Sequence, residues 1–147
     1  MKILTNDKFI KDDPIRPTLS YAWRVSVGEM YYIGEEDDPS AIVCVAMTTY
    51  IPKDAREIAL SKRGLYAIPY SVWSYKKGAG RQIIMDLRDL AIYSGWERLV
   101  TMSPKTDMAH KFHIKNGAFL ICNSIFKRLN ELFARGSDGK GDNRPTF

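Results

Sequence analysis

The sequence is poor in the residue types that build metal and disulfide sites. Its 147 residues include only two cysteines and two histidines. Cys44 and Cys122 each lie in an apolar run, which favours buried free thiols in a reducing compartment. No Cys-x-x-Cys pair and no Cys/His ligand spacing occurs, so we expect no zinc site. The sequence therefore favours a chemistry that needs no metal.

Long apolar runs are also absent. No run approaches the roughly 20 residues of a membrane-spanning helix, and residues 1–11 lack the apolar stretch of a signal peptide. We therefore expect a cytoplasmic protein without membrane association. The formal net charge of +5 favours anionic partners. It does not distinguish nucleic acid, acidic protein and a phosphate-rich coenzyme from one another, and a solvated basic surface would also account for it.

The order of predicted elements indicates a single-domain α/β protein with a mixed sheet. Residues 41–50 are β-branched and almost wholly apolar, which predicts a strand buried on both faces. An acidic turn at 35–39 separates them from a shorter predicted strand at 29–33, so the two strands should form a hairpin. Residues 65–73 predict another strong strand. Pro69 inside it indicates an edge position, a bulge or a splayed strand, because proline cannot donate to the ladder.

Helices and strands alternate in the second half of the chain. The predicted elements there are a helix at 82–94 ended by Gly95, a strand at 97–102, a helix at 104–116 with Ser103 as N-cap and Pro104 as its first residue, and a strand at 119–122. Residues 125–133 fit either a helix or a strand. The polar, glycine-rich residues 136–147 predict a disordered tail, so the domain should span residues 1–135.

A basic, glycine-rich turn, Lys76-Lys77-Gly78-Ala79-Gly80-Arg81, connects the strand at 65–73 to the helix that follows. The first amides of a helix lack internal acceptors and attract anions, and glycines let a diphosphate approach the backbone closely. The turn is neither a P-loop nor a dinucleotide fingerprint, because Arg81 and Gln82 replace the P-loop Lys-Ser/Thr and Ile83 replaces the third glycine. An ordinary tight turn with solvated lysines is the alternative.

The turn resembles the acetyl-CoA loop of the GNAT superfamily of N-acetyltransferases, whose pattern is Gln/Arg-x-x-Gly-x-Gly/Ala. Gly78 and Gly80 match the two small-residue positions, whereas Tyr75 stands where the family has Gln or Arg. The similarity covers about residues 41–122. Beyond the loop, the residues that follow at the family's spacing are Ala109, Phe112, His113, Asn116 and Gly117, with His113 in place of the usual tyrosine and Ala118 in place of phenylalanine.

The resemblance implies a GNAT-like mixed, mostly antiparallel sheet flanked by helices, and transfer of an acetyl (acyl) group from acetyl-CoA to an amine. The loop amides of residues 77–81 would hold the pyrophosphate, and residues 70–73 would pair with the pantetheine arm. The implied coenzyme contacts are Tyr70, Val72, Trp73, Lys76, Lys77, Gly78, Ala79, Gly80, Arg81 and Thr106. The amine acceptor stays open between a small molecule, a protein and a nucleic acid, and a shared sheet edge would allow a homodimer.

The resemblance also implies a candidate general acid. The family tyrosine protonates the departing coenzyme thiolate, and His113 occupies its position. A histidine with an ordinary pKa near 6.5 keeps a useful protonated fraction near neutrality. The alternative is a partly buried residue that fills a tyrosine-shaped space.

A general base is harder to find. Many family members carry a glutamate on the strand before the loop, but residues 63–75 contain no Asp or Glu. Glu29, Glu57 or solvent could take the proton instead. The side chains that could orient the substrate amine are Tyr66, Tyr70 and Ser71, of which Tyr70 and Ser71 are the preferred candidates alongside His113.

The segments around the loop and around His113 also resemble small proteins encoded by tailed phages, including internal virion proteins with a degraded GNAT pattern. This resemblance implies an alternative to catalysis. The chain would then be an inactive GNAT-like virion or nucleic-acid-associated protein, since a fold does not by itself define a function. The absent glutamate and the departure at Tyr75 support this alternative.

Overall fold

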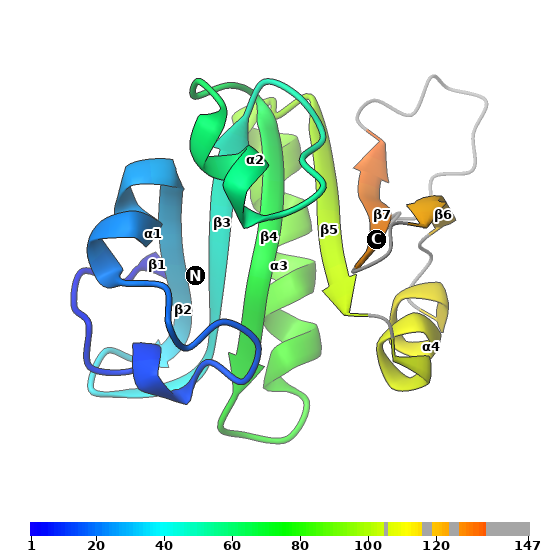
Figure 1. Ribbon diagram of the computed structural model, residues 1–147. Coiled ribbons are helices and arrows are strands. Elements are labelled where there is room, and N and C mark those ends of the chain that lie inside the picture. Colours follow the sequence, from blue (N-terminus) through cyan, green and yellow to red (C-terminus); the bar gives the residue numbers. More distant parts are fainter. Residues whose placement is uncertain (105, 116–118, 124–126, 135–147) are drawn as a thin grey trace.

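A seven-stranded mixed sheet forms the centre of the molecule in a computed structural model of the chain (Figure 1). The structure describes residues 1–104, 106–115, 119–123 and 127–134; the predicted tail at 136–147 and the predicted end of the helix at 116–117 lie outside these residues. The strands are β1 (Lys2–Ile3), β2 (Gly28–Glu35), β3 (Asp38–Thr48), β4 (Tyr66–Ser74), β5 (Arg98–Pro104), β6 (Phe119–Asn123) and β7 (Lys127–Ala134), in the order β1-β2-β3-β4-β5-β7-β6.

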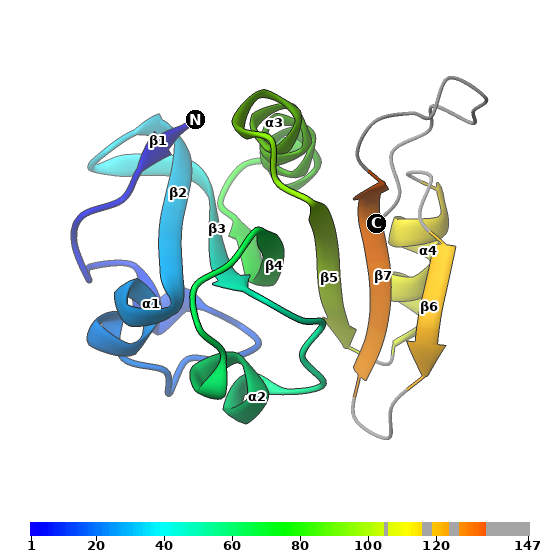
Figure 2. The same cartoon turned by 90° about the horizontal axis from the view of Figure 1, so that it is seen from above.

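Neighbouring strands in this sheet are antiparallel except β4 and β5, which are parallel. Helices cover both faces. Figure 2 shows α3 (Ala79–Ser94) on one face, with α1 (Tyr21–Val27) and α2 (Ala55–Leu60) on the other. Helix α4 (Asp107–Lys115) follows β5 and contacts it. The predicted fold, a mixed and mostly antiparallel sheet flanked by helices, is confirmed.

Strand β3 lies between two apolar cores, one on each face of the sheet, and contributes side chains to both. Its residues 41–46 have no exposed surface, as predicted for a strand buried on both faces. Ile42 and Cys44 face the core beneath α1, whereas Val43 and Val45 face the core beneath α3. The predicted hairpin is confirmed, because β2 pairs antiparallel with β3 from Gly28 opposite Ala46 to Glu35 opposite Asp38.

The predicted amphipathic helix is confirmed as α3. It buries Ile83, Ile84, Leu87 and Ala91 of the predicted apolar stripe, which gives it a fixed face against the sheet. Gly95 ends it in the left-handed conformation, with φ of 69°. The helix starts at Ala79, three residues before the predicted start, because Gly78 serves as its N-cap with φ of 81°. The glycine turn therefore leads directly into the first turn of α3.

The predicted start of the next helix is wrong. Ser103 and Pro104 do not cap a helix; they are the last residues of β5 and pair with Arg128 and Lys127 of β7. Long-range pairing with β7 thus overrides the local Ser-Pro signal. Helix α4 begins later, and its first turn is capped by Thr106, whose hydroxyl accepts the Ala109 amide at 3.1 Å. The segment at 125–133, open between helix and strand, contains β7 from Lys127 onward.

Strand β4 is both bulged and splayed. Cys44 pairs with Ser71 and Val45 with Pro69, so Tyr70 is the extra residue of a bulge next to the proline. On its other side, β4 pairs with β5 only through Tyr66–Arg98 and Ala67–Leu99. Beyond these pairs the two parallel strands diverge, which leaves that edge of β4 unpaired from Pro69 onward among the described residues. Pro69 therefore marks both a bulge and a splay, two of the three possibilities its sequence context predicted.

Candidate functional site

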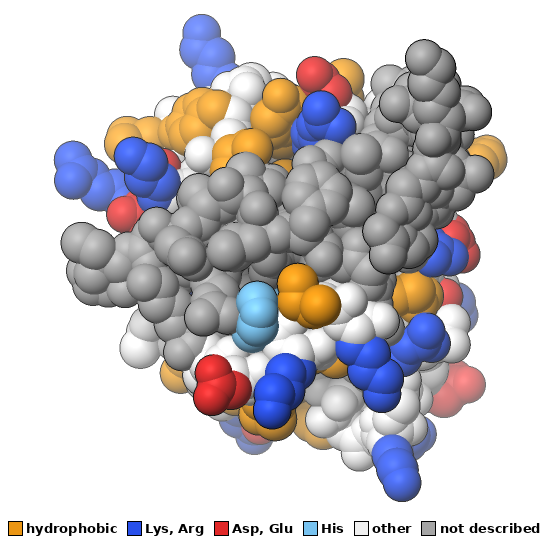
Figure 3. All heavy atoms as spheres, turned by 90° about the vertical axis from the view of Figure 1, so that its right-hand side faces the viewer, with side chains coloured by type: hydrophobic (Ala, Val, Ile, Leu, Met, Phe, Trp, Pro, Cys, Tyr) orange, Lys and Arg blue, Asp and Glu red, His pale blue; other side chains and the backbone are white. Residues whose placement is uncertain are grey.

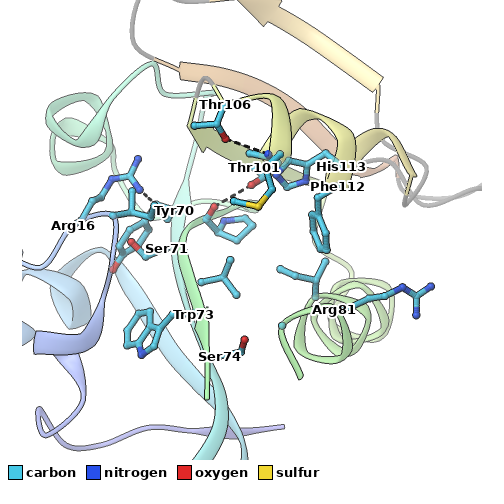
Figure 4. A pocket seen from close by; sticks show the side chains of 17 residues that line it. Arg16, Tyr70, Ser71, Trp73, Ser74, Arg81, Thr101, Thr106, Phe112 and His113 are labelled. Carbon is cyan, nitrogen blue, oxygen red and sulfur yellow. Dashed lines mark hydrogen bonds between the residues drawn. The ribbon is translucent and has the colours of Figure 1, made fainter. Parts of the chain in front are cut away.

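A cavity of about 560 Å³ opens where β4 and β5 diverge. Its walls come from β4, from the first turn of α3, from Thr101 of β5, from α4 and from the segment at Ile15 and Arg16 (Figure 4). Thr101 lies at the narrow end, where its hydroxyl contacts the Pro69 carbonyl at 3.4 Å. The bulge and the splay thus convert a continuous sheet into a wedge-shaped site with main chain along one wall.

The cavity gathers eight of the predicted site residues, from three elements far apart in sequence. They are Tyr70, Ser71, Val72 and Trp73 of β4, Gly80 and Arg81 of α3, and Thr106 and His113 at α4. The other predicted contacts, Lys76, Lys77, Gly78 and Ala79, do not line the cavity; they form the turn at its edge. The Ala79 amide is already engaged, since it donates to the Lys76 carbonyl at 3.1 Å.

Gly80 lines the cavity, and neither side-chain packing nor backbone conformation requires a glycine there. A Cβ added there would meet the Ser74 hydroxyl oxygen at 3.5 Å, which is an ordinary contact, and φ at this residue is not positive. The fold therefore tolerates a side chain at Gly80. By contrast, Gly78 has open space around it but needs its positive φ. A glycine at position 80 leaves the start of α3 open to an anion that approaches from the cavity.

The charges of the loop are exposed and loosely held. Lys76 forms an ion pair with Asp38 at 3.2 Å, and both side chains are more than half exposed. Exposed pairs of this kind contribute little to stability, so Lys76 can exchange its partner for a phosphate at small cost. Lys77 and Arg81 are also exposed. Figure 3, seen from the right-hand side of Figure 1, shows several Lys and Arg side chains on the described surface, with acidic side chains between them.

Tyr75, the residue that departs from the GNAT loop pattern, has a structural role. Its hydroxyl donates to Asp12 at 2.7 Å and accepts from the Trp73 indole at 3.0 Å, while its ring contacts Phe9 edge-on. Partial burial and the hydrogen bond to Asp12 raise its pKa to about 12. Tyr75 therefore ties the loop to the N-terminal segment as a neutral phenol.

Tyr70 and Ser71, the preferred candidates for orienting an amine, are both buried. The bulge turns both side chains toward the core beneath α1, where Tyr70 packs edge-on against Trp23 at 5.5 Å. Burial raises the pKa of Tyr70 far above its ordinary value, so the phenol stays neutral. Tyr66 does not line the cavity and packs against the same core. What β4 presents along the cavity is mainly its backbone.

His113 projects from α4 into the cavity wall beside Phe112 (Figure 4). Burial, together with the nearby His110, lowers its pKa from an ordinary 6.5 to about 4. This low pKa disfavours the protonated fraction at neutral pH that the sequence position of His113 led us to expect. His113 is a neutral imidazole at pH 7, because an apolar wall penalises its charged form.

No acidic side chain lines the cavity among the described residues. The two glutamates considered as bases lie elsewhere. Glu29 pairs with Arg63 at 3.4 Å, and Glu57 caps the start of α2 by accepting the Lys53 amide. Neither carboxylate lines the cavity.

Sequence reasoning missed Arg16, which lines the cavity on the other side of β4 from the start of α3. Its guanidinium donates a hydrogen bond to the Tyr70 carbonyl at the bulge. Nothing in the sequence marks this residue, because 54 positions separate it from Tyr70 and it stands in an irregular proline-containing segment. A buried ion pair fixes that segment: Asp13 and Arg24 meet at 2.8 Å with both side chains wholly buried.

The fold matches solved N-acetyltransferases. One is PaiA N-acetyltransferase from Thermoplasma acidophilum in complex with coenzyme A (9% identity, TM-score 0.51, covering 69% of this chain and 58% of that one). Another is a putative GNAT-family acetyltransferase from Desulfovibrio desulfuricans (12%, 0.55, 74% and 69%). A third is a Bacillus subtilis acetyltransferase in complex with CoA (12%, 0.52, 86% and 90%).

These similarities define the chain as a protein with the GNAT fold. The identities are too low to carry more than the fold, and the chain spans less than three fifths of the Thermoplasma protein. No protein-family model and no curated protein sequence matches the chain. The tailed-phage resemblance finds no support in these structures. In the described part of the chain, no helix is both long and apolar enough to cross a membrane.

Proposed function

We propose that the protein is an acyltransferase that moves an acyl group, acetyl being the simplest, from a coenzyme A thioester to an amine. The observation that carries the proposal is the divergence of β4 from β5. Among the described residues, it leaves one edge of β4 without a strand partner, beside a cavity that ends at the glycine turn and the start of α3. This arrangement offers main-chain groups to an extended amide-containing arm and helix amides to a diphosphate.

The pantetheine arm would lie along Tyr70–Ser74, and the pyrophosphate would lie at Gly80 with Lys76 and Lys77 nearby. Val72 is the β4 side chain that faces the α3 side of the sheet at this point, paired with Val43. Trp73 faces the other way and is held by Tyr75. The side chains and backbone of β4 would therefore hold the arm in one register, and holding two reactants in one geometry is a major source of rate.

The reaction would be direct transfer. The lone pair of a neutral amine forms a bond to the thioester carbonyl carbon, the carbon–sulfur bond breaks, and the coenzyme leaves as a thiolate. The nitrogen releases one proton to solvent, and the thiolate takes up one proton from solvent, so charge and protons balance. No described carboxylate lines the cavity, and a pKa of about 4 makes the imidazole of His113 a weak base, so the amine has to arrive deprotonated. His113 then serves to shape the cavity wall and to offer a neutral imidazole.

Calorimetric titration with acetyl-CoA tests the proposal, with Gly80→Asp as the diagnostic variant. A Cβ at this position makes only ordinary contact with Ser74, and an acidic residue stabilises the first turn of a helix, so the fold should survive. The added carboxylate would repel the pyrophosphate, and we expect coenzyme binding to fall below detection. Tyr93→Asp is the matched control, since Tyr93 is 91% exposed near the other end of α3. Absent binding by the parent, or equal binding by Gly80→Asp, would refute the assignment.

A further inference from the structure

Arg16 occupies the end of the cavity that the coenzyme loop does not reach. Figure 4 shows Arg16 and Arg81 on opposite sides of β4, with Tyr70 and Ser71 next to Arg16. The side chain of Arg16 is partly buried and lines the cavity. If the coenzyme enters from the α3 side, the thioester would face the bulge, and the space on the Arg16 side would be left for the acceptor.

The backbone that carries Arg16 is fixed independently of its side chain. Oδ1 of Asp13 accepts the amides of Ile15 at 2.9 Å and Arg16 at 3.0 Å, and Arg24 donates to the Arg16 carbonyl at 2.6 Å. These contacts survive replacement of the Arg16 side chain. The guanidinium is thus presented from a rigid support, which reduces the entropy lost when it binds a ligand.

The charge of Arg16 is only partly compensated. Its nearest acid, Asp13, is engaged with Arg24 in the buried pair at 2.8 Å. Asp13, Arg16 and Arg24 together therefore carry one net positive charge next to a cavity whose described lining contains no acid. Burial lowers the pKa of Arg16, but a guanidinium stays charged in proteins. The Tyr70 carbonyl accounts for one of its five N–H donors.

We propose that Arg16 binds a carboxylate of the acyl acceptor, so that the acceptor is an amine carrying a carboxylate near its amino group, as an amino acid does. This inference rests on the proposed acyl transfer. A guanidinium holds a carboxylate through two parallel hydrogen bonds, which would place the amino group beside the bulge and the thioester. The same charge disfavours polyamines and lysine side chains, which would bring a second cation into a cavity without a described acid.

The test measures binding of amine pairs to the coenzyme-saturated protein. Each common amino acid is titrated beside its carboxamide, which keeps the amino group and removes the carboxylate. We expect the better amino acids to bind at least about 10-fold more tightly than their amides, because hydrogen bonds to charged groups contribute about 1.5–3 kcal/mol. Arg16→Gln should abolish this preference and leave amide binding and coenzyme affinity unchanged, and Arg16→Lys should restore part of it.

Arg63→Gln is the matched control, since it removes the same charge from an exposed pair outside the cavity. Three results would overturn the inference. In the first, no amino acid binds better than its amide; in the second, Arg16→Gln weakens the binding of both members of a pair equally. In the third, Arg16→Gln weakens the binding of malonyl-CoA but not that of acetyl-CoA or of any amino acid. The last result would place the carboxylate on the acyl group instead. A parent that does not bind coenzyme A at all would remove the proposed function first, and this inference with it.

Discussion

The neutrality of His113 makes a sharp prediction about stability at acid pH. A group whose pKa falls from 6.5 in the unfolded chain to about 4 in the folded protein binds its proton more readily when unfolded. The contribution of His113 to the free energy of unfolding is therefore complete above about pH 6.5 and is lost as the pH falls toward 4. His113→Phe should remove this loss, because phenylalanine fills a similar space and does not titrate.

The expected magnitude follows from the two pKa values. At pH 5 the unfolded histidine is almost wholly protonated and the folded one is mostly neutral. The difference in free energy of unfolding between pH 8 and pH 5 that is due to this residue is then about 2 kcal/mol. For a protein near 150 residues that corresponds to roughly 4–8 °C in midpoint temperature.

The assay is urea unfolding of parent and variant at pH 8 and at pH 5. Carboxylates titrate in both proteins, so the quantity of interest is the parent's loss minus the variant's loss. His110→Gln is a useful control, since His110 contributes to the low pKa of His113 only as the smaller, electrostatic cause. That variant should keep most of the acid sensitivity. Equal losses in the parent and in His113→Phe would show that His113 titrates normally and would reopen its role as a general acid.

Three further outcomes are expected. Asp13→Asn should lower the free energy of unfolding in urea by about 3–5 kcal/mol, because it leaves the charge of the wholly buried Arg24 without its carboxylate. Asp37→Asn, which removes an exposed ion pair, should lower it little, and similar losses in the two variants would contradict the burial argument. Lys76→Ala with Lys77→Ala should weaken acetyl-CoA binding and flatten its dependence on salt, as calorimetry at two ionic strengths would show. With a working acceptor, kcat/KM should rise with pH until the acceptor amine is deprotonated, and a plateau set by an enzyme group instead would point to a base outside the described residues.

The sequence by itself determined the elements whose signals are local. The apolar run at 41–50 predicted a strand with two buried faces, which β3 forms up to Thr48, where it ends two residues before the predicted end. The stripe from Ile83 to Ala91 predicted an amphipathic helix ended by Gly95, which α3 forms. The glycine turn before that helix located one end of the candidate site. Pro69 indicated that the strand before the turn would be irregular. Such features depend on backbone propensity and on the spacing of apolar side chains, and a short stretch of sequence contains both kinds of information.

Only the tertiary structure decided what surrounds the cavity. Pairing with β7 drew Ser103 and Pro104 into a strand, against their local preference for a helix start. Burial of His113 in the cavity wall lowered its pKa and disfavours the protonated state that its sequence position had implied. Arg16 reached the Tyr70 carbonyl across 54 residues. Each of these outcomes depends on desolvation or on contacts between distant segments, and neither quantity exists until the chain has folded.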